Sequence, residues 1–278
     1  MDTAHLQALA ASYLPTASAT DDKYSRGVVG LVVGSEAYPG AAILAIGGAQ
    51  AAQVGMVRYV GPRRVADLAL LSHPETVVSE TIGAAGRVNT WVLGSGVPTD
   101  DAAQVDNMLA ASEQRLPTVL DAGALEALDF DALKSTPMLL TPHAGELERL
   151  VARYLPERQE LRVIGDDLAR SHAATALAAR LGQTVLAKGN VTFIAGHNGE
   201  FAAIGPNSPQ LATAGTGDVL AGLLGGLASH RFDNWFELAP LAVWLHSQAA
   251  ELAGEHGAVV ASDLPRAIPE VIARLRKL

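Results

Sequence analysis

The chain has 278 residues, 49% of them hydrophobic and 18% charged, with a formal net charge of −9. This length suits one large α/β domain or two small ones, and so apolar a composition excludes a disordered protein. The basic residues form no run, which argues against a nucleic-acid partner, and the absence of cysteine excludes thiolate nucleophiles and thiolate metal sites.

The first fifteen residues predict a short amphipathic helix that ends at Pro15. They show no basic stretch followed by an apolar one, as a secretory signal would. No apolar run approaches the roughly 20 residues that span a bilayer. We therefore expect a cytoplasmic protein without a membrane partner.

Short β-branched runs alternate with alanine- and leucine-rich stretches along the rest of the chain. Strands are predicted at Val28–Val33, Met56–Val60, Thr76–Ser79, Thr90–Leu93, Thr118–Leu120, Met138–Thr141, Thr184–Ala187 and Thr192–Ala195. A helix rich in small residues is predicted to open at Pro39-Gly40, and further helices are predicted at about 100–115, 143–154, 160–181, 216–229, 235–256 and 263–277. Such alternation predicts an α/β fold with a central, mostly parallel sheet flanked by helices. No linker divides the chain, so we expect a single domain over 1–278.

A glycine-rich turn, Ala214-Gly215-Thr216-Gly217-Asp218, comes directly before an apolar helix. Glycines allow successive N–H groups to face one point, and the helix dipole adds to this anion site. No Gly-Lys-Ser/Thr follows, so it is not a Walker A loop. An acid beside a phosphate suggests a base that takes a proton from the hydroxyl receiving a phosphoryl group. The alternative is that Thr216 or Asp218 merely caps the helix.

Four other segments place polar or small residues after predicted strands. In Thr141-Pro142-His143-Ala144-Gly145-Glu146, the imidazole could contact a ligand and Glu146 could hold magnesium through water, or both could simply start a helix. Lys188 begins a glycine turn and predicts a phosphate or nucleotide contact, or a plain surface hairpin. Tyr38-Pro39-Gly40-Ala41-Ala42 and Gly94-Ser95-Gly96 allow a flat ligand close to the backbone, or dense packing. Asp121 could face a ligand or metal, or cap the next helix.

These blocks, together with Lys23-Tyr24-Ser25-Arg26-Gly27, resemble the ADP- or ATP-dependent NAD(P)H-hydrate dehydratases of the ribokinase-like superfamily. The resemblance runs from about Lys23 to the last predicted helix. It departs from the family pattern at Ser95, which stands between two glycines in place of a proline. The family repairs NADH and NADPH that carry a hydroxyl at carbon 6 of the nicotinamide ring.

The resemblance implies a role for each block. Asp218 would take the hydroxyl proton, and Gly215, Thr216 and Gly217 would stabilise the transferring phosphoryl. Adenine-nucleotide contacts are implied for Lys188, Gly189, Asn190, Val191, Thr192 and Gly217. Hydrated-dinucleotide contacts are implied for Ala41, Ala42, Gly96, His143 and Asp218. Glu146 would assist Mg²⁺ from the second shell, ADP or ATP would be the phosphoryl donor, and a homotetramer is expected.

Two other functions fit part of the pattern. A ribokinase-like kinase for a vitamin precursor would use the same anion site and base but release a phosphorylated product. A non-catalytic nucleotide-binding protein would have no use for an acid beside the phosphates. Many relatives carry a second, epimerase domain, for which this length leaves no room, so no epimerase activity is expected.

Overall fold

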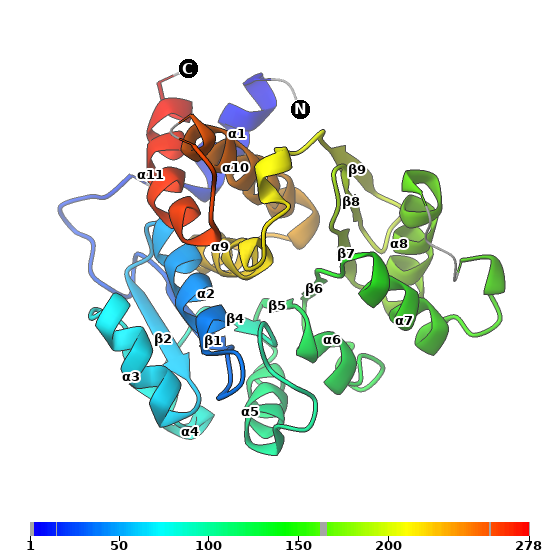
Figure 1. Ribbon diagram of the computed structural model, residues 1–278, viewed down its shortest axis with the longest axis horizontal. Helices are drawn as coiled ribbons and strands as arrows, with labels where there is room; N and C mark the ends of the chain where they lie inside the picture. The colour runs from blue at the N-terminus through cyan, green and yellow to red at the C-terminus, as the bar shows by residue number, and fades with distance from the viewer. Residues whose placement is uncertain (1–2, 15, 162–165, 256, 278) are drawn as a thin grey trace.

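The computed structural model describes residues 3–14, 16–161, 166–255 and 257–277. In these residues the strands form one nine-stranded sheet in the order β3-β2-β1-β4-β5-β6-β7-β8-β9 (Figure 1). The strands are β1 Val28–Val32, β2 Met56–Val60, β3 Val77–Ser79, β4 Thr90–Leu93, β5 Thr118–Leu120, β6 Met138–Leu140, β7 Thr184–Ala187, β8 Thr192–Ala195 and β9 Phe201–Ile204.

The seven strands β1 to β7 pair in parallel. Strands β8 and β9 extend the sheet beyond β7 as antiparallel strands. The central strands are buried on both faces, which explains why they read as continuous apolar runs rather than as alternating ones. Parallel pairing brings the carboxyl ends of β1, β4, β5, β6 and β7 to the same edge of the sheet. Loops that follow these strands therefore meet there.

Helices cover both faces of the sheet (Figure 1). One apolar cluster joins the sheet to α1 Thr3–Tyr13, α2 Pro39–Ala51, α3 Arg63–Ser72, α9 Thr216–His230, α10 Trp235–Gly254 and α11 Leu264–Leu275. The other cluster lies under α4 Ile82–Ala85, α5 Ala102–Ser112, α6 Gly123–Ala127, α7 Ala144–Tyr154 and α8 Asp167–Leu181. None of the helices in these ranges combines the length and apolar character that crossing a bilayer requires.

Small residues bring α2 and α9 into close contact. A Cβ at Gly48 would overlap the Val219 carbonyl oxygen, and one at Gly222 would overlap the carbonyl oxygen of Ala45. Only glycine permits this approach between the two backbones. The contact fixes the start of α9, and with it the glycine-rich turn, relative to the start of α2.

The segment Lys23 to Gly27 precedes β1, at the end of the sheet opposite to these loops. Asp22 Oδ1 accepts the N–H groups of Tyr24 and Ser25, and an Arg26 guanidinium nitrogen donates to the Gln53 carbonyl. Gly27 has a φ of +81° and packs against Ser229, so a side chain would not fit. These contacts give the segment a structural role at the amino end of β1, away from the loops that follow the strands.

The predicted alternation is confirmed, with local corrections. Strand β9 and helices α3, α4 and α6 are not among the elements that the sequence predicts. The predicted helix at 160–181 begins at Asp167, because Asp166 is its N-cap and accepts the Ala169 N–H. Gln159–Leu161 form a separate 3₁₀ turn, and 162–165 lie outside the described residues. Helix α1 ends at Tyr13, and the predicted stop at Pro15 also lies outside them.

Candidate active site

The glycine-rich turn forms the start of α9. Gly215 is the N-cap, with a φ of +92°, and a Cβ there would overlap the Leu44 side chain. The Thr216 hydroxyl lies 2.9 Å from the Leu211 carbonyl and 3.0 Å from that of Thr213, so it anchors the turn rather than capping the helix. N–H groups in the first turn of a helix lack carbonyl partners within that helix, which makes this turn suited to an anion.

Asp218 lies in that first turn and is half-buried. Burial raises its pKa to about 6, and the nearby charge of Asp121 adds to the increase, while Lys188 opposes it. A carboxyl group with this pKa is ionised at neutral pH yet holds a proton more tightly than an ordinary aspartate. These are the properties of a general base that works near neutral pH.

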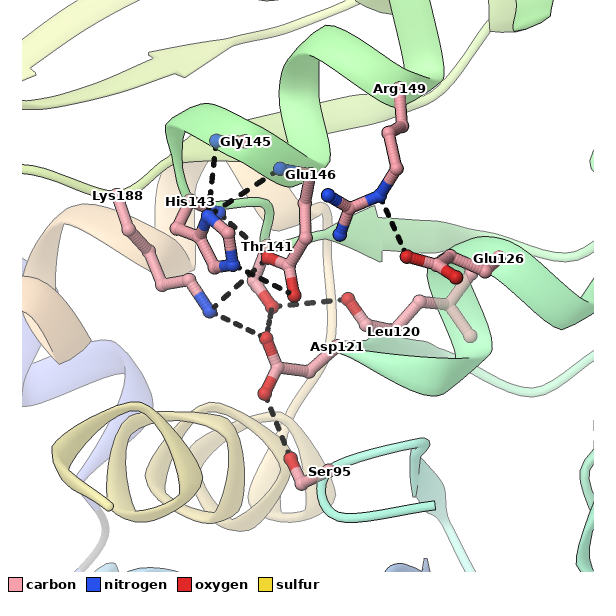
Figure 2. Close-up of polar contacts among 10 residues, drawn as sticks. All are labelled: Ser95, Leu120, Asp121, Glu126, Thr141, His143, Gly145, Glu146, Arg149 and Lys188. Atoms are coloured by element: carbon pink, nitrogen blue, oxygen red, sulfur yellow. Dashed lines mark hydrogen bonds and ion pairs between the residues drawn. The ribbon is translucent and has the colours of Figure 1, made fainter. Parts of the chain in front are cut away.

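Lys188 follows β7, and its ammonium nitrogen points into a group of carboxylates (Figure 2). Nζ lies 2.6 Å from Asp121 Oδ1 and 4.0 Å from Glu146 Oε2. Burial alone would lower the pKa of Lys188, but these two carboxylates outweigh it and the pKa is raised. A Cβ on Gly217 would lie 3.6 Å from Nζ, so the ammonium also adjoins the first turn of α9.

Asp121, directly after β5, is the centre of a buried polar network (Figure 2). Its Oδ2 accepts a hydrogen bond from the Ser95 hydroxyl at 2.9 Å. Its Oδ1 lies 2.9 Å from the Thr141 hydroxyl, which is also 3.0 Å from the Leu120 carbonyl. Because Ser95, Thr141 and Lys188 follow β4, β6 and β7, the network joins four adjacent strand ends.

His143 and Glu146 begin α7 as a reciprocal capping pair. His143 Nδ1 accepts the Gly145 N–H at 3.1 Å, and Glu146 Oε2 accepts the His143 N–H at 2.8 Å. The Glu146 side chain is 8% exposed and that of His143 57%, with Nε2 3.4 Å from Glu146 Oε1. The histidine is thus oriented by the helix start and presents its outer edge to the site.

A cavity of about 450 Å³ opens beside these groups. Predicted residues that line it are His143, Lys188, Gly189, Asn190, Thr192, Thr216 and Gly217. Apolar side chains of Pro209, Leu211, Ala212, Leu220 and Val243 line the remainder, together with Asn207, Ser208 and His246. A polar end beside a helix start and an apolar end suit a ligand that carries both phosphates and a flat ring.

Other predicted residues are not part of this lining, among them Gly215 and Asp218, which belong to the same turn as Thr216 and Gly217. Val191 packs on the core, and its carbonyl accepts from Arg170 at 2.6 Å. Ala41 and Ala42 start α2, where Ala41 faces Gly96 so closely that a Cβ on the glycine would overlap it. The structure therefore brings Ala41 and Gly96 together, at the ends of β1 and β4.

Three further polar residues belong to the site, and none of them is among the contacts that the sequence predicted. Asn207 Nδ2 donates to the Gly189 carbonyl and to Thr192 Oγ1, both at 3.0 Å, and so braces the Lys188 hairpin. His246, buried within α10, also lines the cavity. Ser95, which departs from the family pattern, gains a buried hydrogen bond to Asp121.

Similarity to known proteins supports the geometry. A family model described as NAD(P)H-hydrate dehydratase matches residues 29–274. The chain is 42% identical over 238 residues to a bifunctional NAD(P)H-hydrate repair enzyme of Mycobacterium tuberculosis, covering 82% of this chain and 47% of the relative. It thus spans about half the length of that relative. An ADP-dependent (S)-NAD(P)H-hydrate dehydratase of Neisseria meningitidis is 31% identical over 249 residues, covering 86% of this chain and 81% of the relative.

Solved structures agree on the fold. The Bacillus subtilis ADP/ATP-dependent NAD(P)H-hydrate dehydratase, co-crystallised with ATP/Mg²⁺, superposes with a TM-score of 0.77 at 28% identity, covering 99% of this chain and 97% of that one. A ribokinase-like protein of Enterococcus faecalis has a TM-score of 0.81 at 21% identity, covering 100% and 96% of the two chains, and this likeness shows the fold alone. Because the family model matches most of the chain, from residue 29 to residue 274, the chain belongs to the NAD(P)H-hydrate dehydratase family.

Proposed function

We propose that this protein converts the (6S)-hydrate of NADH or NADPH back to the reduced dinucleotide, driven by phosphoryl transfer from ADP or ATP, with ADP preferred. One observation carries the proposal: a half-buried acid, Asp218, lies in the glycine-rich first turn of α9, where Gly217 adjoins the Lys188 ammonium and both Gly217 and Lys188 line a cavity of nucleotide size. Family membership identifies the hydroxyl that receives the phosphoryl group.

The reaction begins when Asp218 takes the proton of the 6-hydroxyl as that oxygen attacks the terminal phosphorus of the nucleotide. The bond between this phosphorus and the bridging oxygen breaks, and with ADP the product is AMP. Hydroxide is a poor leaving group, whereas the phosphate ester now at carbon 6 departs readily. The ring nitrogen lone pair expels phosphate, and loss of a proton from the adjacent carbon restores the dihydronicotinamide. The sum is hydrate plus ADP giving NAD(P)H, AMP, phosphate and a proton.

The protein supports each step with fixed groups. N–H groups of Gly215, Thr216 and Gly217 would stabilise the transferring phosphoryl, and one such donor is worth roughly 10²–10³-fold in rate. The hairpin from Lys188 to Thr192 would contact the nucleotide. Ala41, Ala42, Gly96 and His143 would contact the hydrated dinucleotide, with His143 held in orientation by its hydrogen bonds to the start of α7.

Magnesium would enter with the nucleotide phosphates and neutralise part of their charge. Mg²⁺ usually keeps several of its waters and takes few protein ligands besides the substrate phosphates. Glu146 offers a buried carboxylate near Lys188 and would hold Mg²⁺ through water. We also propose a cytoplasmic homotetramer acting as a single domain, without membrane or nucleic-acid partners.

An absorbance assay tests the proposed reaction. Purified protein, hydrated NADH and Mg²⁺ are mixed with ADP or ATP, and recovery of reduced nicotinamide is followed at 340 nm. We expect recovery with both nucleotides, faster with ADP, and equimolar AMP when ADP is the donor. Absence of recovery with either nucleotide would refute the proposal, and accumulation of a stable phosphorylated product would indicate a kinase instead.

The variant Asp218→Asn isolates the base. It should bind ADP within about threefold of the parent protein while losing turnover by about 10²–10⁴-fold, the usual contribution of a positioned base. Asp131→Asn is the matched control, because Asp131 is a surface carboxylate paired with Arg180, away from the cavity. Equal loss in both variants would exclude a specific role for Asp218.

A further inference from the structure

We propose that Asp121 is a positioning residue for phosphoryl transfer: its buried carboxylate holds the Lys188 ammonium at the nucleotide cavity, beside the first turn of α9. This inference deepens the proposed function and rests on it. It assigns a role to Asp121, for which the sequence allowed two interpretations: a contact to a ligand or metal, or a helix cap.

Asp121 does not cap the helix that follows it. Helix α6 begins after Ala122, and its start has no side-chain cap. All three of the carboxylate's hydrogen-bond partners are side chains from other loops: Ser95, Thr141 and Lys188. The local sequence position therefore gives no reason for an acid here.

The carboxylate is costly to bury without a compensating charge. Asp121 is 3% exposed, and an ionised group in such a place is tolerated only when paired and hydrogen-bonded. Lys188 supplies the charge at 2.6 Å, and the two hydroxyls fix the direction of the carboxylate oxygens. The hydroxyls thereby determine where the ammonium lies.

That place is at the junction of two functional regions. Lys188 lines the cavity, and its nitrogen adjoins Gly217 in the first turn of α9. The Lys188 backbone is held as well, because its N–H donates to the Pro142 carbonyl at 2.8 Å. Glu146 and Asp218 are the other carboxylates that raise the pKa of Lys188, and Glu146 Oε2 lies 4.0 Å from its nitrogen. Without Asp121 the flexible side chain could turn toward either of them.

The pair also acts on the base. Asp121 raises the pKa of Asp218 and Lys188 lowers it, so the two charges partly cancel there. Beyond them, Glu146 of α7 acts on Lys188, and His246 of α10 is neutral because burial lowers its pKa to about 4. Removing the Asp121 charge should lower the pKa of Asp218 twice over, since the negative charge disappears and the ammonium is freed to approach.

The experiment measures the Asp218 carboxyl directly. Protein with ¹³C-labelled aspartate is titrated by NMR without ligands, and the Asp218 signal is identified by its loss in Asp218→Asn. In Asp121→Asn we expect the pKa of Asp218 to fall by about one pH unit. In Lys188→Met we expect a rise of about one unit, and in the double variant a value within about half a unit of the parent. Asp131→Asn should leave the titration unchanged.

Asp121→Asn removes the nearest carboxylate from the partly buried Lys188 ammonium and could unfold the protein. The double variant removes both charges, so it should be more stable than Asp121→Asn, and Lys188→Met tests the pair from the other side. The proposal is overturned if the pKa of Asp218 is unchanged in Asp121→Asn. If Asp121→Asn does not fold, an unchanged pKa of Asp218 in Lys188→Met overturns it instead.

Turnover then separates the two proposals. If hydrate is repaired, the acidic limb of the kcat profile should move to lower pH in Asp121→Asn along with the NMR titration, which loss of structure alone would not produce. If the parent shows no hydrate repair while the titrations shift as expected, the proposed reaction fails and the electrostatic role of Asp121 stands. If repair occurs and the titrations do not shift, only the role of Asp121 fails.

Discussion

Asp218 carries a pKa of about 6, which gives activity a defined pH dependence. Below this pH the carboxyl group is protonated and cannot accept the hydroxyl proton. We therefore expect kcat to fall about tenfold for each pH unit below 6 and to be level from about pH 7 to 8. Measurement of kcat by recovery at 340 nm from pH 5 to 8, with both substrates saturating, checks this. If the residual activity of Asp218→Asn falls below pH 6 in the same way, the fall belongs to another titrating group.

His246 makes the folded state sensitive to acid. Burial lowers its pKa to about 4, with a smaller effect of Lys188 in the same direction, while a hydrogen bond to the Thr216 backbone opposes both. In the unfolded chain an imidazole binds a proton near pH 6.5. Stability from the neutral ring is thus complete above pH 6.5 and is lost as the pH falls toward 4.

The predicted size of this effect is large enough to measure. Between pH 7 and pH 5 the titration of His246 should remove about 2 kcal/mol from the free energy of unfolding. Urea denaturation at the two pH values should show that loss in the parent protein and a loss smaller by this amount in His246→Gln. Equal losses in the two proteins would show that His246 does not titrate differently in the folded state.

Single residues at the site differ in how far the sequence could predict them. Asp218 and the glycines around it are contiguous, so their joint role could be inferred from one short segment. The contacts of Asp121 could not, because Ser95, Thr141 and Lys188 are separated from it by up to 67 positions. They meet only because four strands end at one edge of the sheet, which depends on strand order and register rather than on local sequence.

At the level of elements, the packing of α9 on α2 determines where the phosphate-binding turn lies. Gly222→Ala would place a methyl group on the Ala45 carbonyl oxygen, and backbone cannot give way as a flexible side chain would. We expect a loss of about 1–3 kcal/mol in the free energy of unfolding and a fall in kcat, because α9 must move away from α2. Urea denaturation and the 340 nm assay measure the two effects.

Gly83→Ala is the matched control for that substitution. Gly83 lies in the short helix α4, and a Cβ there would meet no atom within 4 Å. The change should leave kcat as it is and alter stability by at most about 1 kcal/mol, in the stabilising direction expected for alanine in a helix. If Gly222→Ala behaves in the same way, the close α2–α9 contact is not what positions the turn.

Elements with strong patterns could be predicted, and weak ones could not. The strands from β1 to β8, apart from the exposed edge strand β3, are buried apolar runs beside turn residues, so their positions follow from sequence. Strand β9, Phe201–Ile204, mixes exposed and buried positions at the sheet edge and shows no such run. Helix α6, Gly123–Ala127, has five residues, too few for a helical period to appear, and depends on the fold for its shape.

Across the whole molecule, one sheet connects the predicted dinucleotide side to the predicted nucleotide side. Ala41, in the first turn of α2, and Gly96 belong to the segments that follow β1 and β4, whereas the Lys188 hairpin joins β7 to β8. Each face of the sheet is covered by one apolar cluster, and both clusters contain side chains from β1, β2 and every strand from β4 to β8. Neither the dinucleotide side nor the nucleotide side of the sheet could therefore unfold without exposing apolar side chains of the other side.

This continuity predicts a single cooperative unfolding transition that ADP shifts as a unit. A ligand at 100 times its dissociation constant stabilises the state it binds by about 2.7 kcal/mol, which for a chain of this size raises Tm by roughly 5–10 °C. Calorimetry with and without ADP should show one peak that moves intact, with equal calorimetric and van't Hoff enthalpies. Two peaks of which only one responds to ADP would instead divide the chain into separate domains, with the nucleotide bound to one of them. Lys188→Met should reduce the shift, because the ammonium that lines the cavity is lost while the sheet that carries it remains.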